Sequence, residues 1–322
     1  MPFNDACAHN AFTMTSSFPH SGPISTTMDH ALASPDAVSA SPAAREFLAL
    51  LERELAADQI ELPAYPEVAL QLQRLLMDDN VGNDKVIRLV GLEPVLASRV
   101  MQLANSAALN PRGTAVVELR SAIARLGFNA LRAAAVSFAV TQLRLAPAYQ
   151  NIQESLALLW NENVTMASTA CVVARRSRRI SPDTALFAGL VSGVGKICLL
   201  VRTHDKPALA SEVSSYHEIV RDWHADVTRA LLRHWHVADE IIASVHDFQC
   251  HTQSPQPSPS VLTDVLTVAE LLAAESAVPE QVMESLSQSP AAARLALDPQ
   301  AGVALLSESR DEIEMLRTAL GR

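Results

Sequence analysis

The stretch Gly189-Leu190-Val191-Ser192-Gly193-Val194-Gly195-Lys196 decides the fold of this 322-residue chain. Ser181-Pro182 precedes it, and a serine followed by proline is typical of a helix start. We therefore predict a helix that begins at Pro182 and runs through the stretch to about Arg202. The glycines and the serine leave little side-chain volume, which predicts that another helix packs closely against them.

Two catalytic loops have patterns related to this stretch, but neither one matches it. A nucleophile elbow, Gly-x-Ser-x-Gly, follows a strand and has a glycine two residues before its serine. Here Gly189 lies three residues before Ser192, and a helix start precedes both. A phosphate-binding loop ends in Gly-Lys-Ser/Thr, whereas Ile197 follows Lys196. Close helix packing therefore explains the small residues better than catalysis does.

The composition favours a helical protein of the cytoplasm. Hydrophobic residues make up 49% of the chain, with only 10 glycines and 4% aromatic residues. The formal net charge of -10 argues against non-specific binding to nucleic acid, which needs clustered Lys and Arg. We find no apolar run of the roughly 18–20 residues that a membrane span requires, and no signal peptide. The four cysteines are scattered without a CxxC pair, so we expect buried thiols in a reducing compartment.

Apolar residues at helical spacing begin after a polar segment. Residues 1–40 are rich in Ser, Thr and Pro without periodicity, and we predict that this tail is disordered. Ser41-Pro42 predicts the first helix start, and residues 253–260 read as a linker. Trp160 and Trp235 are predicted to anchor the core. Further helices are predicted near residues 83–91, 94–107, 117–126, 129–145, from 153 to the arginines at 175–179, and near 207–236, 238–249, 261–276, 279–287 and 299–320. For the helix near 207–236, a break around His217 is the alternative.

Histidines and arginines are the candidates for chemistry outside the opening stretch. Seven histidines follow residue 200 without an HExxH motif, and His234 and His236 point in different directions on a helix. His224 shares a helical face with apolar residues, which favours a half-buried histidine. His246-Asp247 is a His-Asp pair close to a helix end. The four arginines are predicted to form a solvated last helical turn, with an anion-binding patch as the alternative: Arg175, Arg176, Arg178 and Arg179.

Four short motifs, in their order and spacing, resemble the HDOD domain. They are Leu62-Pro63-x-x-Pro66, Glu93-Pro94-x-Leu96, Leu103-Ala104-Asn105-Ser106 and Ala122-Ile123-x-x-Leu126-Gly127. HDOD is a bacterial helical module related to HD-type phosphohydrolases, including the HD-GYP enzymes that cleave cyclic di-GMP. The resemblance covers residues 59–255 and implies an all-α, multi-helix bundle. Residues 256–322 are then expected to form a helical extension that packs on it. The family usually has Asp at the position of Glu93.

The resemblance also implies where a metal would lie in the related enzymes. They hold it with a first His, a His-Asp doublet and a distant Asp, which correspond here to Glu162, to Ser192-Gly193 and to Glu270. Two later positions of the enzymes correspond to His224 and to His246-Asp247. Because a hydrolytic metal needs imidazole or carboxylate donors, the missing doublet predicts a degenerate site without metal, cofactor or catalytic residue.

The resemblance implies a non-catalytic regulatory protein of bacterial signal transduction, in stress, motility or virulence regulation. It would contact a signalling protein partner or sense a small molecule, with a nucleotide as a candidate ligand. One alternative is a residual metal-dependent phosphohydrolase for a cyclic dinucleotide or nucleotide, which would use Glu162, His224, His246, Asp247 and Glu270. Another is a pseudoenzyme that binds a nucleotide without hydrolysing it.

Overall fold

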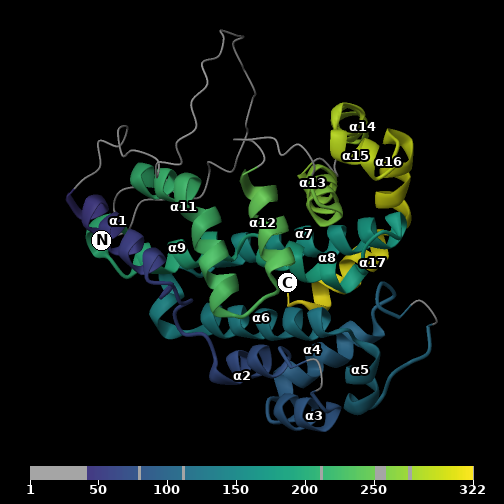
Figure 1. Ribbon diagram of the computed structural model, residues 1–322, viewed down its shortest axis with the longest axis horizontal. Coiled ribbons are helices and arrows are strands. Elements are labelled where there is room, and N and C mark those ends of the chain that lie inside the picture. The colour runs from purple at the N-terminus through teal and green to yellow at the C-terminus, as the bar shows by residue number, and fades with distance from the viewer. Residues whose placement is uncertain are drawn as a thin grey trace. The chain divides into compact units, whose positions relative to one another are not determined.

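A computed structural model describes residues 42–78, 81–110, 113–210, 213–250, 259–274 and 278–321, all within one compact unit. Every regular element among these residues is a helix, which confirms the predicted all-α bundle (Figure 1). The predicted disordered tail, residues 1–40, lies outside the described residues. Most of the predicted linker does as well, since its description begins only at residue 259.

The four HDOD-like motifs lie in the first helices and in the connections between them. The first helices are α1 (Pro42–Ala56), α2 (Glu67–Leu75), α3 (Asn83–Gly91), α4 (Pro94–Asn105), α5 (Leu119–Arg125) and α6 (Phe128–Leu145). Proline occupies the first turn of α4, where its missing N–H costs no helical hydrogen bond. The α6 helix packs on α2, α4 and α8, and eleven of its eighteen residues are buried. It therefore joins the first helices to the rest of the bundle.

The central helices are a short 3₁₀ helix η1 (Pro147–Ile152), α7 (Gln153–Ser177), α8 (Pro182–Val191), α9 (Val194–His204), α10 (Pro207–Ala210), α11 (Val213–His234) and α12 (Asp239–Cys250). Among the central helices, η1, α8 and α9 pack on α7. The predicted continuous helix from Pro182 to about Arg202 is wrong. It is two helices, because Gly193 leaves the helical region at φ −103° and ψ 4°. The predicted helix over 207–236 divides into α10 and α11, and His217, the alternative place for a break, lies inside α11.

The last helices are α13 (Val261–Ala274), α14 (Pro279–Gln288), α15 (Pro290–Arg294), α16 (Pro299–Glu308) and α17 (Arg310–Ala319). Among them, α13 and α17 pack on α7. The predicted helix over 299–320 is interrupted at Ser309, where φ is −102° and ψ is 9°. The α15 helix escaped prediction because five residues show no helical period. Its start is capped by the Ser289 hydroxyl, which accepts from the N–H of Ala292 at 3.3 Å.

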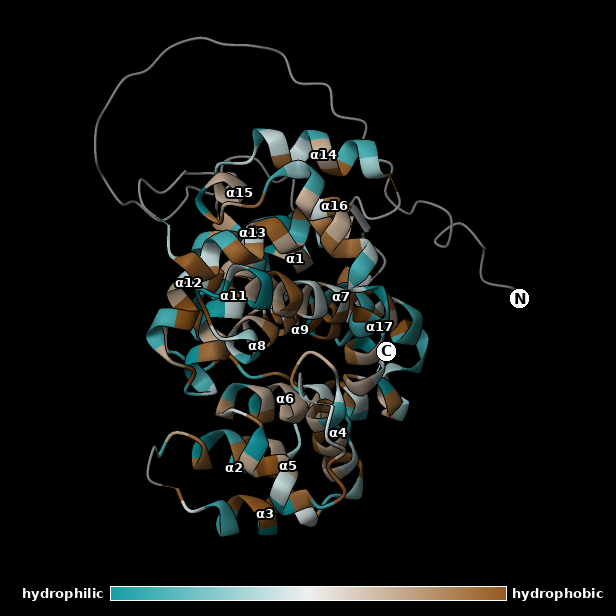
Figure 2. Cartoon of the chain, turned by 90° about the vertical axis from the view of Figure 1, so that its right-hand side faces the viewer, coloured by the Kyte–Doolittle hydropathy of each residue, from teal (hydrophilic) through white to brown (hydrophobic). Residues whose placement is uncertain are grey.

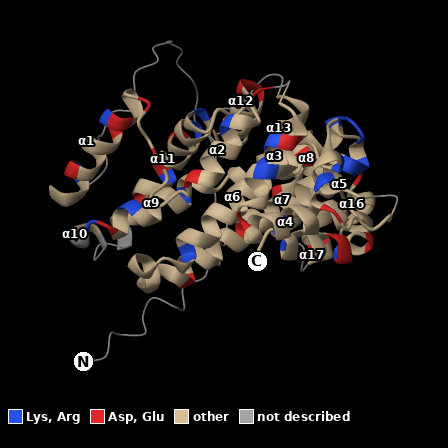
Figure 3. Cartoon of the chain, turned by 90° about the horizontal axis from the view of Figure 1, so that it is seen from below, with Lys and Arg blue, Asp and Glu red and all other residues tan. Residues whose placement is uncertain are grey.

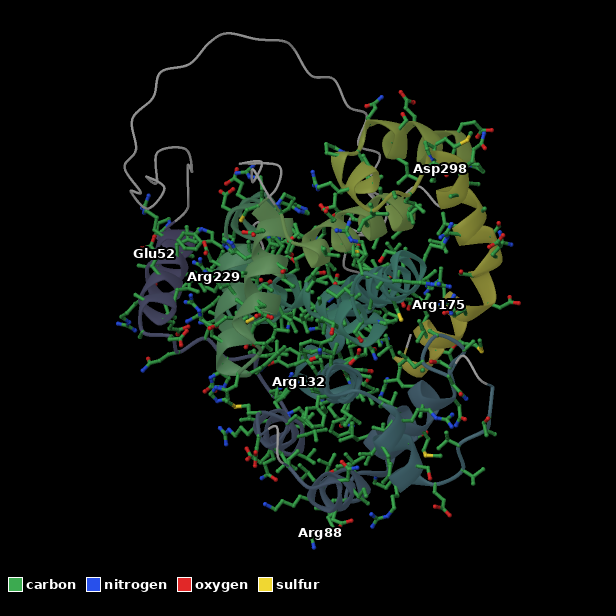
Figure 4. The ribbon with its side chains drawn as sticks, turned by 45° about the vertical axis from the view of Figure 1, so that its right-hand side comes forward. Glu52, Arg88, Arg132, Arg175, Arg229 and Asp298 are labelled. Atoms are coloured by element: carbon green, nitrogen blue, oxygen red, sulfur yellow. The ribbon has the colours of Figure 1, made fainter. Side chains whose placement is uncertain are left out.

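The arginines at the end of α7 contact the last helices. Arg175 forms an ion pair with Glu312 of α17 (Figure 4). Arg179 donates from its guanidinium to the carbonyl oxygen of Arg294 at 2.7 Å. The predicted solvated turn therefore has two of its four arginines engaged with α15 and α17, while Arg176 and Arg178 are exposed.

One segment, Pro182–His204, is long and apolar enough to cross a membrane, with a mean hydropathy of 1.9 over 18 residues. The prediction that no apolar run reaches this length is therefore wrong. A second candidate, Leu119–Arg125 with Phe128–Leu145, qualifies only if its two helices are joined despite a bend of 119°. In the first segment, 78% of the window is buried inside the protein, where α8 packs on α7 and α9 packs on α11 (Figure 2). A helix can be apolar on all sides because it is buried in a protein core or because it is buried in a membrane, so the composition alone does not distinguish the two.

Both predicted anchors are buried, with Trp160 0% and Trp235 1% exposed. The ring of Trp235 stacks on Tyr65 at 5.0 Å between centroids, which joins the Leu62–Pro66 motif to the end of α11. Cys171 and Cys198 are buried free thiols as predicted, whereas Cys250 is only half-buried. The remaining cysteine, Cys7, lies outside the described residues.

Candidate functional site

The junction of α8 and α9 is the centre of the candidate site. Ser192 is buried, and its hydroxyl donates to the carbonyl oxygen of Gly189 at 2.8 Å. From α12, the Gln249 amide donates to the Ser192 carbonyl oxygen at 2.5 Å and to the Thr228 hydroxyl of α11 at 3.2 Å. The same hydroxyl accepts from the N–H of Gly195 at 3.2 Å. Neutral hydrogen bonds thus hold α8, α9, α11 and α12 together at this point.

Asn163 of α7 fills the space beside Gly193. A Cβ atom added to Gly193 would overlap with the amide of Asn163, which is 6% exposed. The Nδ2 atom of Asn163 is buried and has no hydrogen-bond partner within the described residues. A side chain as large as an aspartate could therefore enter position 193 only if Asn163 moved away.

Glu162, the predicted counterpart of the first ligand, is exposed. It acts instead on Tyr216 of α11, whose pKa rises to about 12 through burial and, secondarily, through the negative charge of Glu162. The structure thus places Asn163, and not Glu162, next to the doublet position. Because successive residues on a helix point about 100° apart, a shift of one residue turns the side chain away from the site.

Lys196 lies within electrostatic reach of two other predicted positions. Burial lowers the pKa of His224, and the positive charge of Lys196 lowers it further. The His224 ring bonds through Nδ1 with the carbonyl oxygen of Val220 at 2.9 Å. Glu270 of α13 lies at the exposed rim, and partial desolvation by the helices around it raises the pKa of its carboxyl while Lys196 opposes the rise. This side of the site therefore presents an ammonium group.

His246 belongs to a separate cluster between α11 and α12. Its Nε2 atom lies 3.8 Å from Oδ1 of Asp226, which also pairs with Arg229 at 2.5 Å. The polar contact with His246 and the charge of Arg229 lower the pKa of Asp226 against the opposing effect of burial. Figure 4 labels Arg229 on α11. Asp247, the second half of the predicted pair, is half-buried and forms no ion pair with the described residues.

Cys250 lies next to this cluster, with its sulfur 3.7 Å from Nε2 of His246. Its pKa is raised, first by burial and then by the charge of Asp226. A nucleophilic cysteine needs the opposite shift, since the thiolate is the reactive form. Burial and the charge of Asp226 therefore both disfavour the thiolate form of Cys250.

The residues around the α8–α9 junction do not fit a hydrolytic metal ion. Ser192 and Gly193 supply no imidazole or carboxylate, Asn163 occupies the adjacent space, and Lys196 adds a positive charge. Across the described part of the chain, His, Cys, Asp and Glu form no group of three that could hold a metal.

Sequence reasoning missed Asn163, Thr228, Gln249 and Asp226. Asn163 offered a usable signal, because a polar residue inside an otherwise apolar helical stripe requires a specific polar environment. Thr228 also lies on the same helical face as His224, four residues away, and donates to its carbonyl oxygen at 2.8 Å. Gln249 gave no comparable signal, since its partners lie on other helices, and the contact of Asp226 with His246 likewise joins α11 to α12.

The overlap between Gly193 and Asn163 gives a stability prediction. Gly193→Ala should lower the free energy of unfolding by about 1–2 kcal/mol, because the added methyl must displace the end of one flexible side chain. Asn163→Ala in the same chain should remove most of this cost, which chemical denaturation of the two single variants and the double variant would measure. Costs that simply add in the double variant would contradict the proposed overlap.

Comparisons with known proteins agree with this fold. The family model of the HDOD domain matches residues 62–251. No curated protein sequence is significantly similar to the chain. Among solved structures, a protein from Shewanella amazonensis SB2B, provisionally assigned as a metal-dependent phosphohydrolase, shares 20% identity and a TM-score of 0.67, covering 87% of this chain and 100% of its own.

Two further structures have the same fold. An HDOD domain protein of unknown function from Geobacter sulfurreducens has a TM-score of 0.55 at 20% identity, over 86% of this chain and 96% of its own. A protein from Marinobacter aquaeolei VT8, provisionally assigned to signal transduction, has a TM-score of 0.54 at 18% identity, over 87% of this chain and 66% of its own. Because the family model matches more than half of the residues of this chain, the chain belongs to the HDOD domain family.

Proposed function

We propose that this HDOD protein is a non-catalytic regulator in bacterial signal transduction. The observation that carries the proposal is the α8–α9 junction, where Asn163 stands against Gly193 and Gln249 bonds to the Ser192 carbonyl oxygen. Neutral amides and an ammonium group occupy the region in which a hydrolase would need anionic or imidazole donors. The provisional assignment of the Marinobacter aquaeolei protein to signal transduction supports the same class through its shared fold.

We further propose that the protein works in the cytoplasm through a protein partner or a small-molecule ligand. Nucleic acid is a less suitable partner for a chain with a net charge of -10. In the view of Figure 3, Asp and Glu are interspersed with Lys and Arg over the helices, as suits a protein surface of mixed charge. A nucleotide remains the candidate ligand, bound without hydrolysis.

Metal content and turnover test the non-catalytic assignment. Protein purified without chelator should contain iron, manganese and zinc well below one ion per chain by elemental mass spectrometry. It should also leave cyclic di-GMP and common nucleotides intact. Stoichiometric metal with turnover that disappears in Glu162→Ala would overturn the proposal in favour of a residual phosphohydrolase. Glu154→Ala is the matched control, because Glu154 is also exposed on α7 but lies two turns earlier.

Binding experiments separate the two modes of regulation. Calorimetric titration with cyclic di-GMP and nucleotides should give saturable heat if the protein senses a nucleotide, without product on chromatography. Absence of binding across this panel favours the protein partner. Affinity capture from the native cell, repeated with the purified candidate in a direct binding assay, would then identify that partner.

A further inference from the structure

The end of α7 concentrates positive charge on a chain whose net charge is -10. Its last turn and the connection that follows contain four arginines and no lysine. Arg175 pairs with Glu312 of α17 (Figure 4). The other three, Arg176, Arg178 and Arg179, are exposed, and we call them the arginine corner. The helix dipole favours cations at this end of a helix, but it does not require guanidinium groups.

The carboxylates around the arginine corner are already engaged inside the protein. Nε and Nη2 of Arg294 donate to the two oxygens of Asp264 at 2.9 and 2.6 Å. The Asp298 carboxylate caps α16 by accepting a backbone N–H at 2.8 Å, and the Asp183 carboxylate accepts from the Ser181 hydroxyl. The ion pairs among the described residues include no member of the arginine corner. Its exposed, hydrated guanidinium groups are therefore available to carboxylates of another molecule.

A small notch opens beside the arginine corner, between the end of α7 and the connection from α15 to α16. Its volume is about 20 Å³, enough for a methyl group or the end of a small branched side chain. Its lining includes four apolar side chains and one member of the corner: Val173, Leu295, Leu297, Leu305 and Arg176. Arg179 donates to the carbonyl oxygen of Arg294, the residue before Leu295, at 2.7 Å. Two guanidinium groups thus lie next to an apolar recess.

We propose that the arginine corner and the notch bind an acidic segment of a protein partner. Asp and Glu of that segment would bind the guanidinium groups, and one small apolar side chain would enter the notch. Planar guanidinium groups bind carboxylates through paired, charge-assisted hydrogen bonds, and Arg294 binds Asp264 in this way at the same corner. The inference names the partner chemistry of the proposed function and rests on its protein-partner form.

The notch and the overall charge favour a protein segment over a nucleic acid. A phosphate backbone carries no small apolar side chain between its charges, so it would leave the notch unused. A long polyanion would also extend beyond the arginine corner over a chain with a net charge of -10, whereas a short acidic segment meets only the corner.

Titration of the full chain into a fluorescently labelled peptide, in which Asp and Glu flank a single valine, tests the site by fluorescence polarisation. We expect saturable binding that added salt weakens and that Arg176→Gln weakens about tenfold, the effect of losing one charge-assisted hydrogen bond. Arg176→Lys should restore only part of the loss, because it keeps the charge without the planar donors. Arg88→Gln is the matched control, since it removes an equal charge from an exposed position on α3 (Figure 4) and should bind as the native chain does.

Variants of the peptide separate the notch from the charges. Replacing its valine by serine should weaken binding several-fold, and replacing its acidic residues by Asn and Gln should abolish binding. No saturation with the acidic peptide, or equal affinity in Arg176→Gln and the native chain, would contradict the proposal. Tighter binding of a single-stranded oligonucleotide, with no effect of the valine, would identify a general polyanion surface instead. Metal content and turnover do not depend on this corner, so a failure here leaves the non-catalytic assignment to its own test.

Discussion

Trp160→Ala is expected to lower the free energy of unfolding by about 3–5 kcal/mol, the usual cost of truncating a fully buried tryptophan. The side chain is 0% exposed in the middle of the bundle, on the helix that contacts α8, α13 and α17. It also donates to the carbonyl oxygen of Gly321. The variant therefore leaves a large cavity and releases the turn that follows α17. Urea denaturation followed by circular dichroism would measure the loss.

Two controls separate the packing of Trp160 from its hydrogen bond. Trp160→Phe keeps an aromatic ring but removes the indole N–H, so its additional loss from the hydrogen bond should be about 1 kcal/mol. Leu158→Ala changes a side chain on the same helix that is 60% exposed, and we expect its effect to stay within about 0.5 kcal/mol. A cost for Trp160→Ala no larger than that for Leu158→Ala would show that the tryptophan does not anchor the core.

The sequence predicted the helices whose own period and boundary residues define them. The prediction over 83–91 agrees with α3 at both ends, and Pro182 begins α8 as expected from Ser181-Pro182. The predictions fail where a break depends on tertiary contacts. The helix through Ser192 breaks at Gly193, a residue of low helix propensity, and a hydrogen bond from α12 to the Ser192 carbonyl oxygen joins this junction to a neighbouring helix. Ser309, which interrupts the last predicted helix, is an ordinary helix residue by propensity.

The place of the candidate site stays a prediction from the resemblance, and its detail depends on contacts between helices. The resemblance located the doublet position at Ser192-Gly193, and the structure brings helices α7, α11 and α12 to that point. A correspondence between distant relatives can be displaced by one residue along a helix. Such a displacement is the difference between Glu162, which the resemblance implies, and Asn163, which lies beside Gly193 in the structure. The correspondence also could not show that His246 turns toward Asp226, because that contact joins two helices far apart in sequence.

Gly195→Ala is expected to destabilise the protein by about 3 kcal/mol, at the upper end for overpacking a core. A Cβ atom there would overlap with the carbonyl oxygen of His224 and lie 2.9 Å from the backbone nitrogen of Thr228. The Thr228 hydroxyl would lie 2.5 Å away as well. Because two of these three obstacles are backbone atoms of α11, α9 and α11 must move apart to admit the methyl group. This outweighs the gain of up to about 1 kcal/mol that alanine brings inside a helix. Thermal and urea unfolding would measure the net effect.

Two comparisons make the Gly195 prediction specific. Gly91→Ala is the matched control, because a Cβ atom in α3 would meet only a Leu119 methyl group at 3.9 Å, and this variant should be neutral or slightly more stable. Thr228→Ala should not rescue Gly195→Ala, since the His224 carbonyl oxygen remains, whereas Asn163→Ala should rescue Gly193→Ala. Rescue by Thr228→Ala would mean that a side chain, and not the backbone, sets the approach of α9 to α11. In that case, replacing the Thr228 side chain would be enough to make room for a larger residue at position 195, and neither α9 nor α11 would have to move.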